Sequence, residues 1–145
     1  MISKAIYSIL NVSAITDLVN DISPVIARPN VQFPYIVFNE KGNPEDSKDG
    51  YDIINHSVQI DIYTEKDRDG NGGFAEAIAI RDEVEKLFYR TSGIIAGCDI
   101  RTTVLSDEVM LYDQLSQASR IIMTFEVREY KEVNGIAPVL EQFVQ

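Results

Sequence analysis

The sequence predicts a two-layer α+β domain, in which a mostly antiparallel sheet of about four strands packs on one main helix, with two short N-terminal helices. Residues 58–62 and 121–127 alternate apolar and polar side chains at a period of two, which is typical of strands with one buried face. This alternation favours an antiparallel sheet, because a parallel sheet buried on both faces contains continuous apolar runs. Residues 73–90 instead repeat their apolar side chains at helical spacing, which indicates the main helix.

Length and composition predict a single domain over residues 1–145. A chain of 145 residues with 45% apolar residues can bury one good core and rarely two. Within this domain we expect N-terminal helices in residues 1–23, the sheet and main helix in residues 24–129, and a C-terminal extension in residues 130–145.

Charge and hydropathy exclude several classes of partner. The formal net charge is −10 and the 13 Lys and Arg residues form no basic run, so we expect no direct binding of nucleic acid. No apolar run approaches the roughly 20 residues that span a bilayer, and residues 1–10 are too short and too polar for a signal peptide. We therefore expect an intracellular protein without membrane contact. Cys98 is the single cysteine, so we expect a buried, inert thiol and no internal disulfide.

Two short helices are expected before the sheet. Ser3 and Ser13 can each cap a helix, and Pro24 prevents the second helix from continuing. The apolar side chains at helical spacing are Ile2, Ile6, Ile9 and Leu10 in the first helix and Ile15, Leu18, Val19 and Ile22 in the second.

Four segments have the pattern of strands. Pro34 keeps Phe33 extended and cannot donate a ladder hydrogen bond, so the first strand begins after it and covers residues 35–39. The other three strands cover residues 55–65, 98–105 and 119–130. Polar loops are expected at residues 41–52 and 107–119. In the main helix, the residues on the apolar face are Ala77, Ile80, Val84 and Leu87.

The second face of the predicted sheet is polar but not uniformly charged. It carries Gln59, Asp61, Tyr63, Thr124, Glu126 and Arg128. Such a face is either wetted by solvent or lines an assembly, and the sequence leaves both alternatives open.

The turn DRDGNGG matches part of a calcium-binding loop. Asp67, Asp69, Asn71 and Gly72 occupy positions one, three, five and six of that pattern. Position twelve should supply a bidentate glutamate, but it is Ile78, and a strand instead of a helix precedes the loop. The alternative is a strand-to-helix turn with Asn71 as the helix cap.

The same turn also spells a weak dinucleotide-binding pattern, G-x-G-x-x-A, with Gly70, Gly72 and Ala75. That pattern normally follows a buried parallel strand directly. Here an alternating strand and the charged residues 65–69 precede it, and their carboxylates would lie near the pyrophosphate. We therefore expect no cofactor at this turn.

Catalytic residues are hard to assemble from this sequence. His56 is the only histidine, so any Ser-His-Asp, Cys-His or two-histidine metal arrangement depends on it. It shares the apolar face of its strand, so we expect it to be packed or half exposed and not catalytic. Loop carboxylates are plentiful, but no nucleophile or phosphate cradle accompanies them. A structural or binding role is favoured over enzymatic activity, with a calcium-dependent or other binding module and an unrecognised hydrolase as alternatives.

Five segments, in their order and spacing, carry a resemblance to a known family: IYSILNVSAITDLV, FPYIVF, HSVQIDIYTE, FAEAIAIRDEVEKLF and LYDQLSQASRIIMTFEV. They resemble the tail-completion, or tail-terminator, proteins of long-tailed bacteriophages and prophages. The likeness covers residues 6–128. The polar loop at residues 41–50 and the tail at residues 130–145 depart from the family pattern.

The resemblance implies an α+β fold and a homo-oligomeric ring, a hexamer, that caps the finished tail tube and presents a head-joining surface. Its implied partners are the tail-tube protein and the head-completion protein, and it implies no catalysis and no cofactor. It also implies assembly in the host cytoplasm and a final location in the virion tail, from a phage or a prophage in a bacterial genome.

A closed ring of heterologous contacts requires two different complementary patches on each subunit. One candidate is the polar sheet face with its edge, and another is the pair of loops at residues 41–52 and 107–119. The apolar residues of the C-terminal segment either dock on a neighbour or fold back on their own core. The interface residues that we predict are Lys41, Asn43, Glu45, Asp46, Lys48, Tyr112, Asp113 and Phe143.

Calcium distinguishes two of these alternatives. A calcium-dependent module requires that calcium raise the Tm and that Asp67→Ala abolish the rise, because a ligand that binds only the folded state stabilises it. The tail-terminator interpretation expects no change of Tm with calcium, and a fold that is indifferent to both Asp67→Ala and His56→Ala. Thermal unfolding with and without calcium measures the difference, and a calcium-dependent rise lost in Asp67→Ala would contradict the tail-terminator interpretation.

Overall fold

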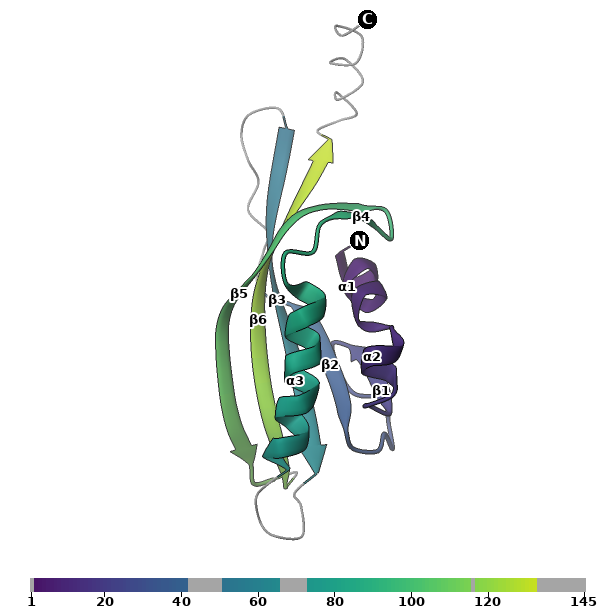
Figure 1. Ribbon diagram of the computed structural model, residues 1–145, viewed down its shortest axis with the longest axis vertical. Coiled ribbons are helices and arrows are strands. Elements are labelled where there is room, and N and C mark those ends of the chain that lie inside the picture. Colours follow the sequence, from purple (N-terminus) through teal and green to yellow (C-terminus); the bar gives the residue numbers. More distant parts are fainter. Residues whose placement is uncertain (1, 42–50, 66–72, 116, 133–145) are drawn as a thin grey trace, which may run out of the picture.

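The computed structural model describes residues 2–41, 51–65, 73–115 and 117–132, which form one curved sheet with helices on its concave face (Figure 1). The helices are α1 (Ile2–Leu10), α2 (Ser13–Thr16) and α3 (Phe74–Phe88). The strands are β1 (Asp21–Pro24), β2 (Tyr35–Glu40), β3 (Tyr51–Glu65), β4 (Gly93–Ile95), β5 (Cys98–Asp113) and β6 (Ala118–Glu132). No helix in these ranges is long and apolar enough to cross a bilayer.

The predicted sheet was wrong in its number of strands and in its arrangement. Six strands follow the order β1-β2-β3-β6-β5-β4, so the sheet is half as large again as expected. It is mixed, because β1 runs parallel to β2 while the other neighbouring pairs are antiparallel. The missed strands β1 and β4 have only four and three residues, too few for an alternating pattern to be recognised. The broad α+β class is retained.

The second predicted helix is shorter than expected. It ends at Thr16, and Ile22 lies in strand β1, where it is buried. Asn20 explains the change of structure, because its backbone N–H donates to the Pro34 carbonyl and its side-chain amide donates to the Phe33 carbonyl at 2.7 Å. These bonds join the chain to the two residues that precede β2, so the helix does not continue. The N-cap residue is Val12 and not Ser13.

The predicted loop at residues 107–119 is largely strand. β5 continues to Asp113 and β6 begins at Ala118, so a short turn replaces most of that loop. The register between β5 and β6 shifts between Leu105 and Asp107, which indicates a bulge that adds one residue. The bulge interrupts the alternation that the strand prediction relied on.

Several elements agree with their prediction. Strand β2 begins at Tyr35, directly after Pro34, and α3 lies within the predicted helical segment. The alternating apolar residues of β3 and β6 are buried, as are three of the four predicted residues of α3, while Leu87 is partly buried and Phe88 completes the helix face. The buried residues of β3 and β6 are Val58, Ile60, Ile62, Ile121, Met123, Phe125 and Val127.

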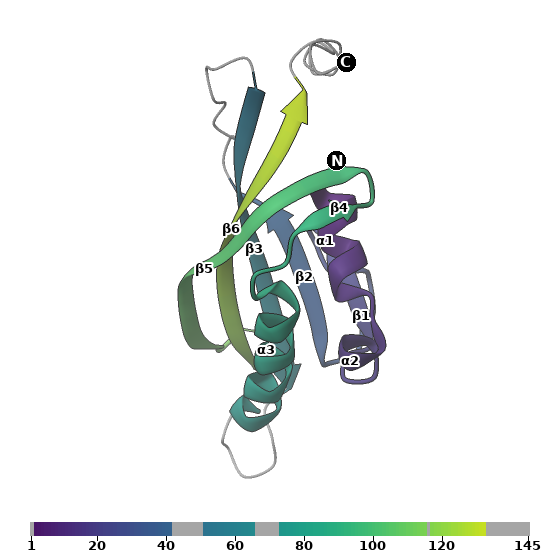
Figure 2. The same ribbon diagram turned by 45° about the horizontal axis from the view of Figure 1, so that its top comes forward.

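β3 and β6 form the longest pairing in the sheet, from Tyr51 with Glu132 to Glu65 with Ala118. β2 pairs with β3 only between Val58 and Tyr63, so residues 51–57 of β3 extend beyond β2. Figure 2 shows these ends of β3 and β6 projecting past the helices, with the hairpin of β4 and β5 crossing near the start of α1. The sheet therefore has a compact end covered by helices and a projecting end.

Gly73 starts α3 in a conformation that other residues rarely adopt. Its φ is 73°, and a Cβ atom at this position would lie 2.1 Å from the Glu65 carbonyl oxygen. The Thr64 hydroxyl donates to the Gly73 carbonyl at 3.0 Å, which fixes the end of β3 against the start of the helix. The N-cap is therefore Gly73 and not Asn71. Because β3 is antiparallel to both neighbours, this turn also lacks the parallel strand of a dinucleotide-binding site.

The stack of Phe88 on Phe125 gives a test of how α3 is held. The two buried rings lie 4.6 Å apart between centroids. We expect Phe88→Ala to lower the free energy of unfolding by about 3–5 kcal/mol, because it leaves a cavity between the helix and the sheet. Urea unfolding measures this. The adjacent control Tyr89→Ala, at an exposed position, should change it by less than about 0.5 kcal/mol. Equal effects of the two substitutions would contradict this packing.

Candidate functional site

The predicted interface residues do not form one patch. Lys41 follows β2 and its backbone N–H donates to the Ser57 carbonyl, whereas Tyr112 lies near the end of β5. Ser57 pairs with Glu126 and Tyr112 pairs with Ser119, so about 23 Å of strand β6 separates the two levels of the sheet. The backbone of Asp113 ends β5. The other predicted interface residues lie outside the described residues: Asn43, Glu45, Asp46, Lys48 and Phe143. The proposed calcium ligands of residues 67–72 also lie outside them.

The outer face of the sheet, opposite the helices, is neither uniformly polar nor uniformly wet. Near the compact end, two rows of side chains cross β2, β3, β6 and β5 in register. The first row is Tyr35, Tyr63, Arg120 and Leu111, and the second is Val37, Asp61, Ile122 and Val109. Towards the projecting end, Glu126 and Arg128 are exposed. The apolar residues of this face are far apart in the sequence, and only the pairing of the strands brings them together.

Aromatic and charged side chains are tied together in the first row. The ring centroids of Tyr35 and Tyr63 are 4.9 Å apart, and the Arg120 guanidinium lies 5.3 Å from the Tyr63 centroid. Arg120 Nη2 also donates to Asp61 Oδ2 at 2.6 Å. Asp61 is only 5% exposed, and Gln59 donates to its other oxygen. The Asp61 carboxylate is therefore bound by residues of the same chain and is not simply solvated.

A lip of three residues, Val25–Ala27, borders this face. Together with Tyr35, Asp61, Tyr63 and Arg120 it lines a pocket of about 390 Å³. Val25 and Ile26 are 71% and 76% exposed, which is unusual for two consecutive apolar side chains. Tyr and Arg next to exposed apolar groups are the composition expected of a protein contact surface.

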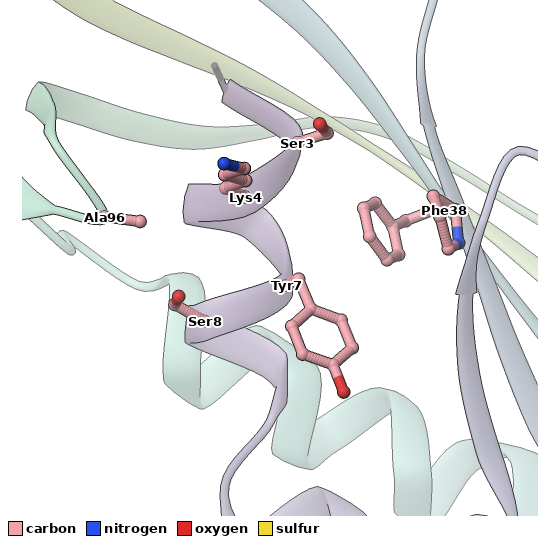
Figure 3. Close-up of a pocket in the computed structure, with 7 residues that line it drawn as sticks. Ser3, Lys4, Tyr7, Ser8, Phe38 and Ala96 are labelled. Carbon is pink, nitrogen blue, oxygen red and sulfur yellow. The ribbon is translucent and has the colours of Figure 1, made fainter.

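A second pocket, also about 390 Å³, lies over α1. Figure 3 shows Tyr7 on the side of α1 that faces Phe38, and Lys4 and Ser8 on the side that faces Ala96. The Tyr7 and Phe38 rings are 6.4 Å apart. One cation and a few hydroxyl groups are present among apolar walls, without a carboxylate or histidine among the lining residues. Such a pocket can accept an apolar group.

His56 is the best catalytic candidate by residue type, and its surroundings are structural. It is 6% exposed, with Nδ1 at 2.5 Å from Glu40 Oε2 and Nε2 at 2.8 Å from Glu129 Oε1. Carboxylates accept hydrogen bonds, so this pairing is complete when both ring nitrogens donate. Neither nitrogen is then free to act on a substrate. Of the two alternatives expected for His56, packed or half exposed, the structure shows the packed one.

Cys98 lies next to this cluster and does not supply an activated nucleophile. Burial raises the pKa of the Cys98 thiol, and the Glu129 carboxylate raises that pKa further. The thiol therefore stays protonated, as expected of an inert buried cysteine. The described residues contain no group of three His, Cys, Asp or Glu side chains arranged to hold a metal ion.

Sequence reasoning missed Glu40 and Glu129 as partners of His56. Glu40 stands two residues after buried Phe38, and Glu129 two residues after buried Val127. A period of two therefore puts both on the same sheet face as His56, which stands two residues before Val58. A polar residue that continues an apolar face was the available signal.

Comparison with known proteins gives a family. The profile of a family described as "Tail completion protein gp17" matches residues 4–130. No curated protein matches this sequence significantly. Among 35 chains of solved structures that match, one comes from the "Virion of native gene transfer agent (GTA) particle". It has a TM-score of 0.62 and 13% identity, over 87% of this chain and 84% of that one, which shows a common fold.

From the sequence we expected His56→Ala to leave the fold unchanged. The contacts of His56 with Glu40 and Glu129 lead to a different prediction. Removing the imidazole leaves the Glu40 and Glu129 carboxylates close together, with Glu129 buried, so the free energy of unfolding should fall by about 3 kcal/mol. Chemical denaturation measures this. Adding Glu40→Gln and Glu129→Gln should recover part of the loss, and Ser57→Ala, on the other face of β3, should change little. An unaltered stability of His56→Ala would show that the cluster does not hold the strands.

Proposed function

We propose, because this chain belongs to the tail completion protein gp17 family, that its copies form a closed ring at the end of a phage tail tube. The chain is a structural protein of phage-type particles. The finer role that we propose is to cap the finished tube and to offer the surface on which the head is joined. The family match over most of the chain is the observation that carries this proposal.

The proposed partners follow from that position in the particle. Further copies of the chain complete the ring, as a hexamer, and the tail-tube protein and the head-completion protein bind its two sides. The ring assembles in the host cytoplasm and remains in the virion tail. The role requires no cofactor and no catalysis, which agrees with a His56 whose two ring nitrogens are both occupied.

The shape of the molecule supports a ring. A closed ring requires that each copy offer two different, complementary surfaces. One edge of the six-stranded sheet is β1, and the other is formed by β4 and β5. The two edges therefore differ in sequence and can offer different surfaces. The projecting ends of β3 and β6 add a feature that reaches beyond the compact part and could bind a different partner from the neighbouring copies.

The net charge of −10 supports a location beside packaged DNA. A polyanion that passes through a ring is not retained by a wall of the same charge. Tight binding of duplex DNA by the assembled ring at physiological salt would contradict this part of the proposal.

The ring itself is the measurement that tests the proposed function. We expect light scattering or native mass spectrometry to give a mass of several chains, six for a hexamer, with a central opening in electron micrographs. Where the free protein is smaller, we expect the same ring when purified tail tubes are added. A chain that stays monomeric and never binds tube ends would overturn the proposal, and a tube protein with an altered end surface is the control for specific binding.

A further inference from the structure

One edge of the sheet is a long strand with little cover. β4 pairs with β5 only at residues 98–100, and no strand in the described ranges lies against β5 residues 101–113 on the side away from β6. Edge strands of this length are usually protected by lysines, by prolines or by a covering element, because their free backbone groups pair with other chains. Residues 101–113 contain neither lysine nor proline, and their charged residues and the bulge lie outside residues 109–112, which are left without any of these protections.

The part of this edge after Glu108 is apolar or aromatic on both sheet faces. We call residues 109–112 the β5 edge. Val109 faces outward and is 42% exposed, while Met110 faces the helix side and is 48% exposed. Leu111 extends the outward set, in the row that ends at the Tyr35 and Tyr63 rings. A monomer gains nothing from such exposure, whereas a buried contact removes this apolar surface from water.

The charges beside the β5 edge are negative. Asp107 is exposed. Glu108 accepts a hydrogen bond from Arg81 of α3, and this bond is the main reason why the pKa of Arg81 lies above its ordinary value. Arg81 also binds Glu85 at 2.9 Å and Asp82 at 3.0 Å, so this cation is shared among three carboxylates. The surface around the edge therefore keeps an acidic character.

The opposite end of the sheet has complementary properties. It consists of β1 and the lip Val25–Ala27, in which two consecutive side chains are largely exposed. Arg28 follows the lip and is 66% exposed, with one long contact of 3.5 Å to Asp21. Pro24 cannot donate a backbone hydrogen bond at the outer side of β1, so this end offers side chains instead of a backbone ladder.

We propose that the lip of one copy packs on the β5 edge of a second copy of this chain. Val25 and Ile26 cover Val109 and Met110, and Arg28 faces Asp107. The inference rests on the proposed ring, and it names the two surfaces of its repeating contact. The two surfaces differ and lie at opposite ends of the sheet. Each copy therefore binds one neighbour through its lip and the other neighbour through its β5 edge, as a head-to-tail ring requires.

Matched substitutions test this contact. Ile26→Asp alters the lip, with Ile94→Asp as its control, because these isoleucines are 76% and 78% exposed and Ile94 lies on β4. Val109→Asp alters the β5 edge, with Leu18→Asp as its control, at 42% and 39% exposure. Each altered chain should lose ring formation by about tenfold or more, because an apolar contact then buries an unpaired charge. Both controls should form rings as the wild type does, and circular dichroism confirms that all four chains are folded.

A mixture of the two altered chains tests the head-to-tail order. The Val109→Asp chain keeps an intact lip and the Ile26→Asp chain keeps an intact β5 edge, so an equimolar mixture has one intact contact per pair. We expect a species of two copies and no ring, in solution and on tail tubes. A symmetric contact between two β5 edges would instead leave Ile26→Asp associated by itself.

The outcomes separate the contact from the proposed function. A wild-type chain that forms no ring, free or on tubes, overturns the proposed function and the contact together. Wild-type rings with rings of equal yield from Ile26→Asp or from Val109→Asp overturn the contact alone.

Discussion

The pairing of β3 with β6 is the constraint on which the rest of the molecule depends. It runs over the full 15 residues of β3, and every other element is placed against it directly or through one neighbour. Its inner face packs on α3, where Phe125 of β6 stacks on Phe88, and farther along the strands it carries the His56 cluster. Because side chains alternate across a strand, this one register decides which residues meet the helices and which meet solvent.

The polar cluster of His56, Glu40 and Glu129 specifies the register of the strands, which apolar residues alone do less strictly. His56 joins Glu40 of β2 to Glu129 of β6, so diagonal contacts tie three neighbouring strands together. A slip of one residue in any of them would turn a charged group to the opposite face and leave its partners buried without it. Specific polar contacts of this kind penalise wrong registers more strongly than they stabilise the correct one. They are well placed at the point where the sheet leaves the cover of its helices.

Sequence reasoning was reliable where a single face of a long segment decided the structure. Val58, Ile60 and Ile62 on β3 and Ala77, Ile80 and Val84 on α3 were assigned correctly, because periodicity is a local signal. It was unreliable where pairing with a distant strand decided the outcome. Ile22 fits a helix by spacing, yet bonds from Asn20 to the chain at residues 33 and 34 lead it into β1.

The β5 edge and the lip could not be predicted from the sequence, because both depend on how distant strands pair. Val109 belonged to a predicted loop, and the bulge at Ser106 concealed that it continues a strand. The lip carried no periodic pattern at all, and its exposure depends on how β1 joins the sheet. The partners of His56 come from residues 16 and 73 positions away, so no local window of sequence contains the cluster.

The contact at Gly73 has a consequence for how the protein can be altered. The Glu65 carbonyl and the Gly73 backbone lie so close together that no Cβ atom fits between the end of β3 and the start of α3. Two contacts thus position the start of the helix against β3: the close approach of Gly73 to the Glu65 carbonyl, and the Thr64 hydrogen bond to the Gly73 carbonyl. A variant that is to keep the position of α3 must therefore keep glycine at position 73, because any side chain there would collide with the Glu65 carbonyl.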